Sequence, residues 1–146
     1  MIWLLRHGDA EEAATDDDSR RLTAKGERQA RAAGEAMAEL DAGIETCLTS
    51  PKLRALETAV LACDAFGAEP EPTAQLRGGD FDPVELAAGR GEVLLVGHEP
   101  DFSRAVQLVT GARIEMKKGG LAVIEGSVLI ALIRPGAMRR IAGWQA

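Results

Sequence analysis

The stretch "LLRHGDA", residues 4–10, decides how we expect the chain to fold. It completes a short continuous apolar run over residues 2–5, which is typical of a strand covered on both faces. Arg6 and His7 follow directly, although nothing in a buried strand requires two such polar side chains. Gly8 then suits a turn. The stretch therefore predicts a buried strand that carries an arginine and a histidine to its carboxyl end.

Helical patterns follow this strand and the next one. In residues 22–40 small and apolar side chains recur at helical spacing, and Thr23 can serve as the N-cap. The run "IETCLTS", residues 44–50, is typical of a second strand. It leads into a predicted second helix over residues 50–66, with Ser50 as N-cap and a proline at the first helical position.

The second half of the chain continues the alternation of strands and helices. Prolines and glycines interrupt residues 67–91, where we expect one short helix over 83–88. The further predicted elements are a strand at 93–96, a helix at 100–109, and strands at 113–117, 120–124 and 127–134, the last two joined as a hairpin through "EG". This order predicts a three-layer α/β sandwich, in one domain over residues 1–146, whose mostly parallel sheet has an antiparallel edge from the tail.

Composition excludes several classes of function. With 146 residues the chain has the length of one domain, and its net charge of −6 argues against nucleic acid as a partner. No apolar run approaches the roughly 18 residues of a membrane span, and the N-terminus lacks the features of a signal peptide, so we expect a cytoplasmic protein with no membrane partner. Cys47 and Cys63 lack ligand spacing and are expected to be free, buried thiols. The acidic run "TDDDSRR", residues 15–21, is interpreted as a solvated loop.

Three predicted strands end in polar residues that suit an anion. The first ends at Arg6 and His7, the second at a helix that carries Arg54, and the third at His98. Carboxyl ends of parallel strands share one edge, where open α/β sheets bind ligands. Both histidines of an acidic chain thus meet two arginines near two helix starts, which favour negative charge. The pattern predicts a site for a phosphate-sized dianion.

These segments also resemble a known family. The matching pieces are "LLRHGDA", "RRLTAKGERQA", "TSPKLRALETA", "RGGD" and "LLVGHEPDFS", which together span residues 4–103. They resemble the histidine phosphatase superfamily of phosphoglycerate mutase-like fold, and within it the SixA-like phosphohistidine phosphatases. The resemblance implies that His7 is a nucleophile, that Arg6 and Arg54 bind phosphate, and that His98 stabilises the transferring phosphoryl group. No metal or other cofactor is then required.

Other site residues are less directly marked by the resemblance. It places Arg20 near the pocket, and in the functional interpretation Gly8 lets the backbone approach the phosphate. For the general acid we choose Asp80 in "RGGD" from the carboxylates of residues 67–91. The asparagine-containing loop of mutase-type members is absent after Gly8, so mutase activity is not expected.

The leading hypothesis is a metal-independent phosphatase with a phosphohistidine intermediate. Its expected substrate is phosphohistidine on a protein such as a histidine-containing phosphotransfer domain. The short middle region should leave the pocket open, and a leaving imidazole needs less proton assistance than an alkoxide does. The alternatives are a broad phosphomonoesterase acting on small phosphate esters and a phospho-binding module with little turnover. A metal hydrolase is a further alternative, but the two histidines lack HxH or HxxxH spacing.

Overall fold

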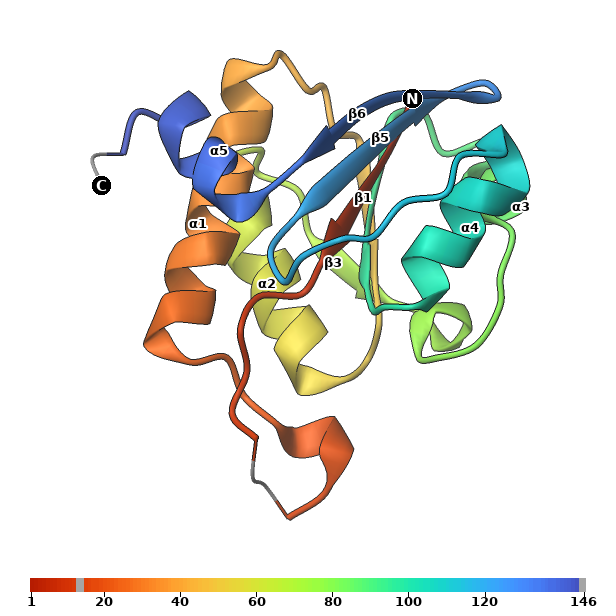
Figure 1. The fold of residues 1–146 in the computed structure, drawn as a ribbon. Helices are drawn as coiled ribbons and strands as arrows, with labels where there is room; N and C mark the ends of the chain where they lie inside the picture. The colour runs from red at the N-terminus through yellow and green to blue at the C-terminus, as the bar shows by residue number, and fades with distance from the viewer. Residues whose placement is uncertain (13–14, 145–146) are drawn as a thin grey trace.

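Six strands and five helices alternate along most of the chain in the computed structural model, which describes residues 1–12 and 15–144 (Figure 1). The strands are β1 (Ile2–Arg6), β2 (Thr46–Thr49), β3 (Pro70–Pro72), β4 (Val93–Gly97), β5 (Leu121–Glu125) and β6 (Val128–Ile133). The helices are α1 (Ala24–Glu39), α2 (Leu53–Cys63), α3 (Pro83–Ala87), α4 (Asp101–Thr110) and α5 (Pro135–Ile141), with 3-10 turns η1 (Asp17–Ser19) and η2 (Ala74–Leu76).

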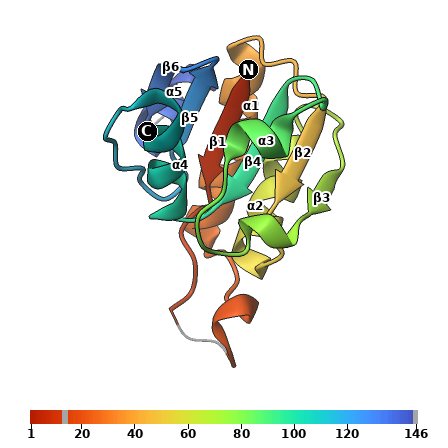
Figure 2. The ribbon, with the colours of Figure 1, turned by 90° about the vertical axis from the view of Figure 1, so that its right-hand side faces the viewer.

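The strands form one sheet in the order β3-β2-β4-β1-β5-β6. The four strands from β3 to β1 are parallel, whereas β5 runs antiparallel to β1 and β6 antiparallel to β5. The predicted, mostly parallel sheet with an antiparallel edge from the tail is therefore confirmed (Figure 2). In the parallel pair at its centre, Leu5 lies opposite Val96 and Arg6 opposite Gly97.

Helices cover both faces of the sheet, which explains the continuous apolar run of β1. Trp3 and Leu5 pack into a cluster with Met37 of α1 and Met138 of α5, while Leu4 packs with Phe102 of α4 on the other face. Figure 1 shows α1, α2 and α5 on one side of the sheet and α3 and α4 on the other. The central apolar residues of β1, Trp3, Leu4 and Leu5, are thus buried as the sequence predicts, while Ile2 is partly buried.

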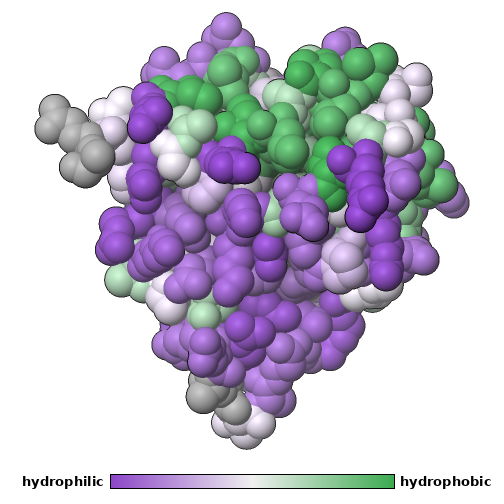
Figure 3. Space-filling model, viewed as in Figure 1, coloured by the Kyte–Doolittle hydropathy of each residue, from purple (hydrophilic) through white to green (hydrophobic). Residues whose placement is uncertain are grey.

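Figure 3 shows a mainly hydrophilic face whose apolar part lies over the end that carries β5 and β6. The exposed apolar side chains there include Val128, Ile130 and Leu132 of the edge strand β6. No described helix is both long and apolar enough to cross a membrane. Cys47 and Cys63 are free and buried, which confirms that prediction.

Some element predictions are wrong. Residues 113–117 form no strand, because they lie against α4 rather than in the sheet. The strand β3 and the helix α5 were not predicted, since each is short and begins at a proline that sequence patterns assign to a break. Helix α2 begins at Leu53 after Lys52, so Ser50 is not its N-cap. The Ser50 hydroxyl instead contacts His98, as described below.

Close backbone packing between α1 and α2 provides a test of the fold. A Cβ atom added to Gly34 would lie 2.3 Å from the carbonyl oxygen of Ala62. Replacing a helical glycine by alanine ordinarily stabilises a helix by up to about 1 kcal/mol. We expect Gly34→Ala instead to lower the free energy of unfolding by about 1–3 kcal/mol, measured by urea denaturation. Gly43→Ala is the control, because its nearest neighbour would be a glutamate side-chain atom at 3.8 Å; equal stability of the two variants would contradict the expectation.

Candidate active site

The carboxyl ends of β1 and β4 bring the two histidines together. His7 follows β1 and His98 follows β4, and their ring centroids lie 5.3 Å apart with the planes inclined by 56°. The backbone N–H of His7 donates to the carbonyl of Gly97 at 3.0 Å, which continues the strand pairing past Arg6. Both imidazoles are buried, with 6% and 7% of their residue surface exposed. The predicted meeting of these side chains at one sheet edge is found in the structure.

The tautomer of neutral His7 is set by its own turn. Its Nδ1 lies 2.7 Å from the carbonyl oxygen of Gly8, and a carbonyl can only accept. Nδ1 therefore carries the proton and Nε2 keeps its lone pair. The turn itself is fixed from α2, because the Gly8 amide donates to the Thr58 hydroxyl at 3.1 Å. The backbone thus presents His7 with a basic nitrogen turned away from its own turn.

His98 is held by a serine at the end of β2. Its Nε2 lies 2.8 Å from Ser50 Oγ, and the same oxygen accepts the backbone N–H of Lys52 at 3.2 Å. The serine hydroxyl can therefore donate to Nε2, and in that tautomer the proton of neutral His98 lies on Nδ1. That nitrogen is buried and has no hydrogen-bond partner among the described residues.

Burial and nearby cations keep both imidazoles neutral at ordinary pH. The pKa of His7 is lowered from 6.5 to about 4, chiefly by desolvation and also by the charges of Arg54, Arg6 and Lys118, while the hydrogen bond to the Gly8 carbonyl opposes this shift. Desolvation, followed by the charge of His7 and those of Arg54 and Lys52, lowers the pKa of His98 to about 3. Neutral histidines at neutral pH follow from both values.

Two arginines lie near the histidines, since the charges of both lower the pKa of His7. Arg6 donates from Nη1 to the Met116 carbonyl at 2.8 Å, and Arg54 donates from Nη1 to the Asp17 carbonyl at 2.7 Å. In both guanidinium groups Nε is buried without a partner among the described residues, as is Nδ1 of His98. Buried donors without acceptors are rare and call for an explanation. The oxygens of a bound anion would supply acceptors to all three.

The acidic run after β1 is exposed for most of its length, as interpreted from sequence, but Asp17 is also bound to several cations. The Asp17 carboxylate lies 2.9 Å from Lys52 Nζ, 3.2 Å from Arg54 Nη2 and 3.3 Å from Arg20 Nη1. These cations hold the pKa of Asp17 far below its usual range. Arg20, which was expected near the pocket, is therefore linked to Arg54 through this one carboxylate. The loop is thereby tied to Arg54 of α2.

The neighbours of Asp17 explain why the run contains three aspartates. Asp16 caps the 3-10 turn by accepting the amide of Ser19 at 2.9 Å. Asp18 forms an ion pair with Arg77 in the middle region of the chain. Each aspartate thus has a separate partner, and the loop is tied to two other parts of the molecule.

The structure explains why a glycine stands at position 8, for a reason that the sequence did not reveal. A Cβ at this position would lie 2.6 Å from the carbonyl oxygen of Gly26 in α1, so no larger residue fits. Its amide is already bonded to Thr58 and does not point to a free anion site. The structure therefore attributes the glycine to packing against α1, and gives no support to a direct phosphate contact by its amide.

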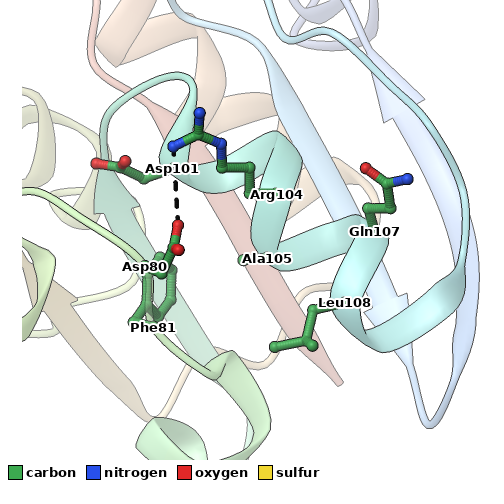
Figure 4. A pocket seen from close by; sticks show the side chains of 7 residues that line it. All are labelled: Asp80, Phe81, Asp101, Arg104, Ala105, Gln107 and Leu108. Carbon is green, nitrogen blue, oxygen red and sulfur yellow. Dashed lines mark ion pairs between the residues drawn. The ribbon is translucent and has the colours of Figure 1, made fainter.

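The structure does not bring Asp80 to the histidines. Its side chain is 83% exposed and lies 3.8 Å from Arg104 Nη1 of α4. Figure 4 shows the two side chains facing each other across a surface hollow lined also by Phe81 and Leu108. Neither histidine lines this hollow. The assignment of Asp80 as general acid therefore has no contact in its favour.

Three residues of the site were missed by sequence reasoning as functional candidates. They are Asp17, Ser50 as the partner of His98, and Lys52. The position of Ser50 at the end of a strand was visible, but its pairing with a residue 48 positions away was not. Lys52 stands two residues before Arg54, and this proximity was the available signal. An acidic residue between several cations has no local signature.

Comparisons with known proteins show which family model and which relative the chain matches. Residues 2–100 match the family model described as the histidine phosphatase superfamily (branch 1). An uncharacterized protein of Picosynechococcus sp. is 33% identical over 135 residues, which cover 82% of this chain and 81% of that protein.

Solved structures share the fold. The protein histidine phosphatase SixA complexed with tungstate has a TM-score of 0.81 at 24% identity, covering 94% of this chain and 98% of that one. A protein of Agrobacterium tumefaciens described as a candidate phosphohistidine phosphatase SixA has a TM-score of 0.77 at 23% identity, covering 92% and 97%. The arrangement of strands and helices is thus the one found in these proteins.

The neutral histidines predict an acid-sensitive fold. The pKa of each is lower in the folded chain than the 6.5 of an unfolded histidine, so the unfolded state binds extra protons between about pH 4 and 6.5. The free energy of unfolding should therefore fall as pH falls through this window. Above pH 6.5 neither histidine makes the free energy of unfolding depend on pH. We expect His98→Gln to reduce the slope between pH 6.5 and 5 by up to about 1.4 kcal/mol per pH unit, measured by urea denaturation. Equal slopes would contradict the assignment of neutral His98.

The Asp17 carboxylate should weaken anion binding by partly neutralising the site. In Asp17→Asn the backbone bond to Arg54 can remain, while the negative charge is lost. We expect vanadate, a phosphate analogue, to bind about fivefold more tightly at low salt, with the difference shrinking as salt is raised. Calorimetry measures the affinity. Asp18→Asn is the matched control, since Asp18 pairs with Arg77 and with no cation of the site; equal gains in both variants, or none, would show that Asp17 has no special effect.

Proposed function

The chain belongs to the histidine phosphatase superfamily, and from this premise we propose that it removes the phosphoryl group from phosphohistidine on a protein, through a covalent intermediate on His7. The single observation that carries the proposal is the state of His7. Its Nδ1 donates to the Gly8 carbonyl and its pKa is lowered to about 4. A neutral imidazole with a free Nε2 is a nucleophile that needs no further activation at neutral pH.

The charges around His7 suit a phosphoryl group in transfer. Charge develops on the three equatorial oxygens of such a group, and fixed donors aimed at them stabilise the transition state. The guanidinium groups of Arg6 and Arg54 and the Nδ1 of His98 are donors of this kind. Charge-assisted bonds from arginine are stronger than neutral ones. In the proposed mechanism these three residues therefore bind the phosphoryl oxygens without a metal ion.

The proposed reaction has two displacements at phosphorus. In the first, the lone pair of His7 Nε2 forms a bond to phosphorus while the phosphorus–nitrogen bond of the substrate breaks. The substrate's ring takes a proton from solvent on its other nitrogen, so it keeps that electron pair and leaves as neutral imidazole. In the second, water attacks phosphorus, loses a proton to solvent, and the bond to Nε2 breaks. Inorganic phosphate leaves and neutral His7 is regenerated.

The choice of phosphohistidine follows from the weak case for a general acid. Asp80 is paired with Arg104 and has no contact with the histidines. A phosphohistidine ring that is protonated on its other nitrogen, a group with a pKa near 6.5, departs as neutral imidazole without a general acid at the breaking bond, whereas an alkoxide does not. The middle of the chain, between α2 and β4, holds only the short elements β3, η2 and α3. This supports an open site that a side chain of another protein can enter.

Covalent trapping tests the role of His7. The enzyme is mixed with a substrate carrying labelled phosphate, quenched at alkaline pH where phosphohistidine survives, and mapped by mass spectrometry. We expect the label on His7, and at least about a 10³-fold loss of turnover in His7→Ala. His98→Gln serves as a comparison, because any label it retains should still map to His7. A label on another residue, or near-normal turnover in His7→Ala, would exclude the mechanism.

A substrate comparison tests the leaving group. We expect kcat/KM for a phosphohistidine peptide to exceed that for phosphoserine and other alkyl phosphates by at least about tenfold, equal to 1.4 kcal/mol of transition-state preference. p-Nitrophenyl phosphate should also be hydrolysed, since its leaving group is a weak base. All substrates are measured at one pH with a chelator present. Should an alkyl phosphate be preferred tenfold, the enzyme is a small-molecule phosphomonoesterase; loss of activity in the chelator would contradict a metal-independent mechanism.

A further inference from the structure

A groove of about 530 Å³ opens beside the paired histidines, between α4 and residues 113–117. Arg6 lines it, together with Pro100 and Met116. Arg6 joins the groove to the histidine pair, because its charge also lowers the pKa of His7, although neither histidine itself lines the groove. Its volume lies within the roughly 300–1,000 Å³ of ligand pockets, so it has room for groups beyond a phosphoryl group.

The groove is positive in an acidic protein. Its charged lining residues are Arg6, Arg104, Arg113, Lys117, Glu99 and Glu115, four cations against two carboxylates. The chain as a whole has a net charge of −6. Arg113 and Lys117 are exposed, and neither forms an ion pair with any residue that the structure describes. These two cations are therefore available to a ligand.

One of the two carboxylates is already engaged. Glu99 accepts the backbone N–H of Ser103 at 2.8 Å and that of Met116 at 3.2 Å, and it also accepts the Ser103 hydroxyl. These bonds join the start of α4 to residues 113–117, which explains why this segment leaves the sheet. Glu99 thus holds the two sides of the groove together, while Arg104, Arg113 and Lys117 on the walls of the groove are exposed.

We propose that this groove binds an acidic polypeptide segment next to the phosphorylated residue of the substrate protein. The inference rests on the proposed function, because it concerns the substrate of the same site. Arg113 and Lys117 lie unpaired on one wall, and Arg104, which also pairs with Asp80, lies on the other; these cations suit an extended chain with several carboxylates. A small metabolite would present one or two anions and would not need a groove of this extent.

Two matched phosphohistidine peptides test the proposal. They have the same length, and the residues flanking the phosphohistidine are aspartates in one and serines in the other. For the wild-type enzyme we expect kcat/KM to be at least about fivefold higher for the acidic peptide at low salt, and the preference to decline as salt is raised. In the double variant Arg113→Gln/Lys117→Gln the preference should disappear. The control is Arg28→Gln/Arg31→Gln, which removes the same charge from exposed positions of α1 and should keep the preference.

The outcomes separate this proposal from the proposed function. Hydrolysis of both peptides with equal kcat/KM by the wild-type enzyme would overturn the proposal that the groove binds an acidic segment, and would leave the proposed phosphatase activity standing. Failure to hydrolyse either peptide, with hydrolysis of p-nitrophenyl phosphate, would overturn the phosphohistidine substrate. A preference that persists in the double variant, or is lost equally in the α1 control, would show that net charge and not the groove selects the substrate. Stronger dependence of 3-phosphoglycerate than of the acidic peptide on Arg113 and Lys117 would assign the groove to a small anion instead.

Discussion

The parallel pairing of β1 with β4 is the interaction on which the site depends. These strands are 87 or more residues apart in sequence, yet their register places Arg6 opposite Gly97. The next residue of each strand is then a histidine, and the two imidazoles meet at 5.3 Å. A shift of one residue would turn every side chain of β1 to the opposite face. The apolar clusters on both faces of the sheet therefore fix the chemistry as well as the fold.

The sequence predicted the parts of this arrangement that depend on strand order. The apolar run before Arg6 required cover on both faces, and the alternation with helices required parallel neighbours. The shared edge of the strand ends then predicted that His7, His98 and Arg54 lie together. The tail was predicted less well, since residues 113–117 have a strand-like composition but are held against α4 by Glu99. A long-range bond of this kind leaves no periodic pattern.

The contacts that set the electrostatics could not be predicted for a similar reason. A run of three aspartates looks like a solvated surface, because local sequence does not show which cations will fold against it. Asp17 contacts Lys52 and Arg54, which come from a segment about 35 residues further on. The role of Gly8 was hidden as well, because its restriction comes from the backbone of Gly26 in another element. Sequence reasoning finds the residue types of a site more readily than the partners that orient them.

Burial connects the stability of this site with its chemistry. Removing the two imidazoles from water favours their neutral forms, and nearby guanidinium groups add to this effect. The same burial leaves donors of Arg6, Arg54 and His98 without acceptors, which costs free energy in the unliganded protein. A phosphoryl dianion would reverse this cost, because its oxygens accept from all three groups while Nε2 of His7 keeps its lone pair. The nitrogen atoms that lack hydrogen-bond partners in the free protein are thus the ones suited to bind a phosphoryl group in transfer.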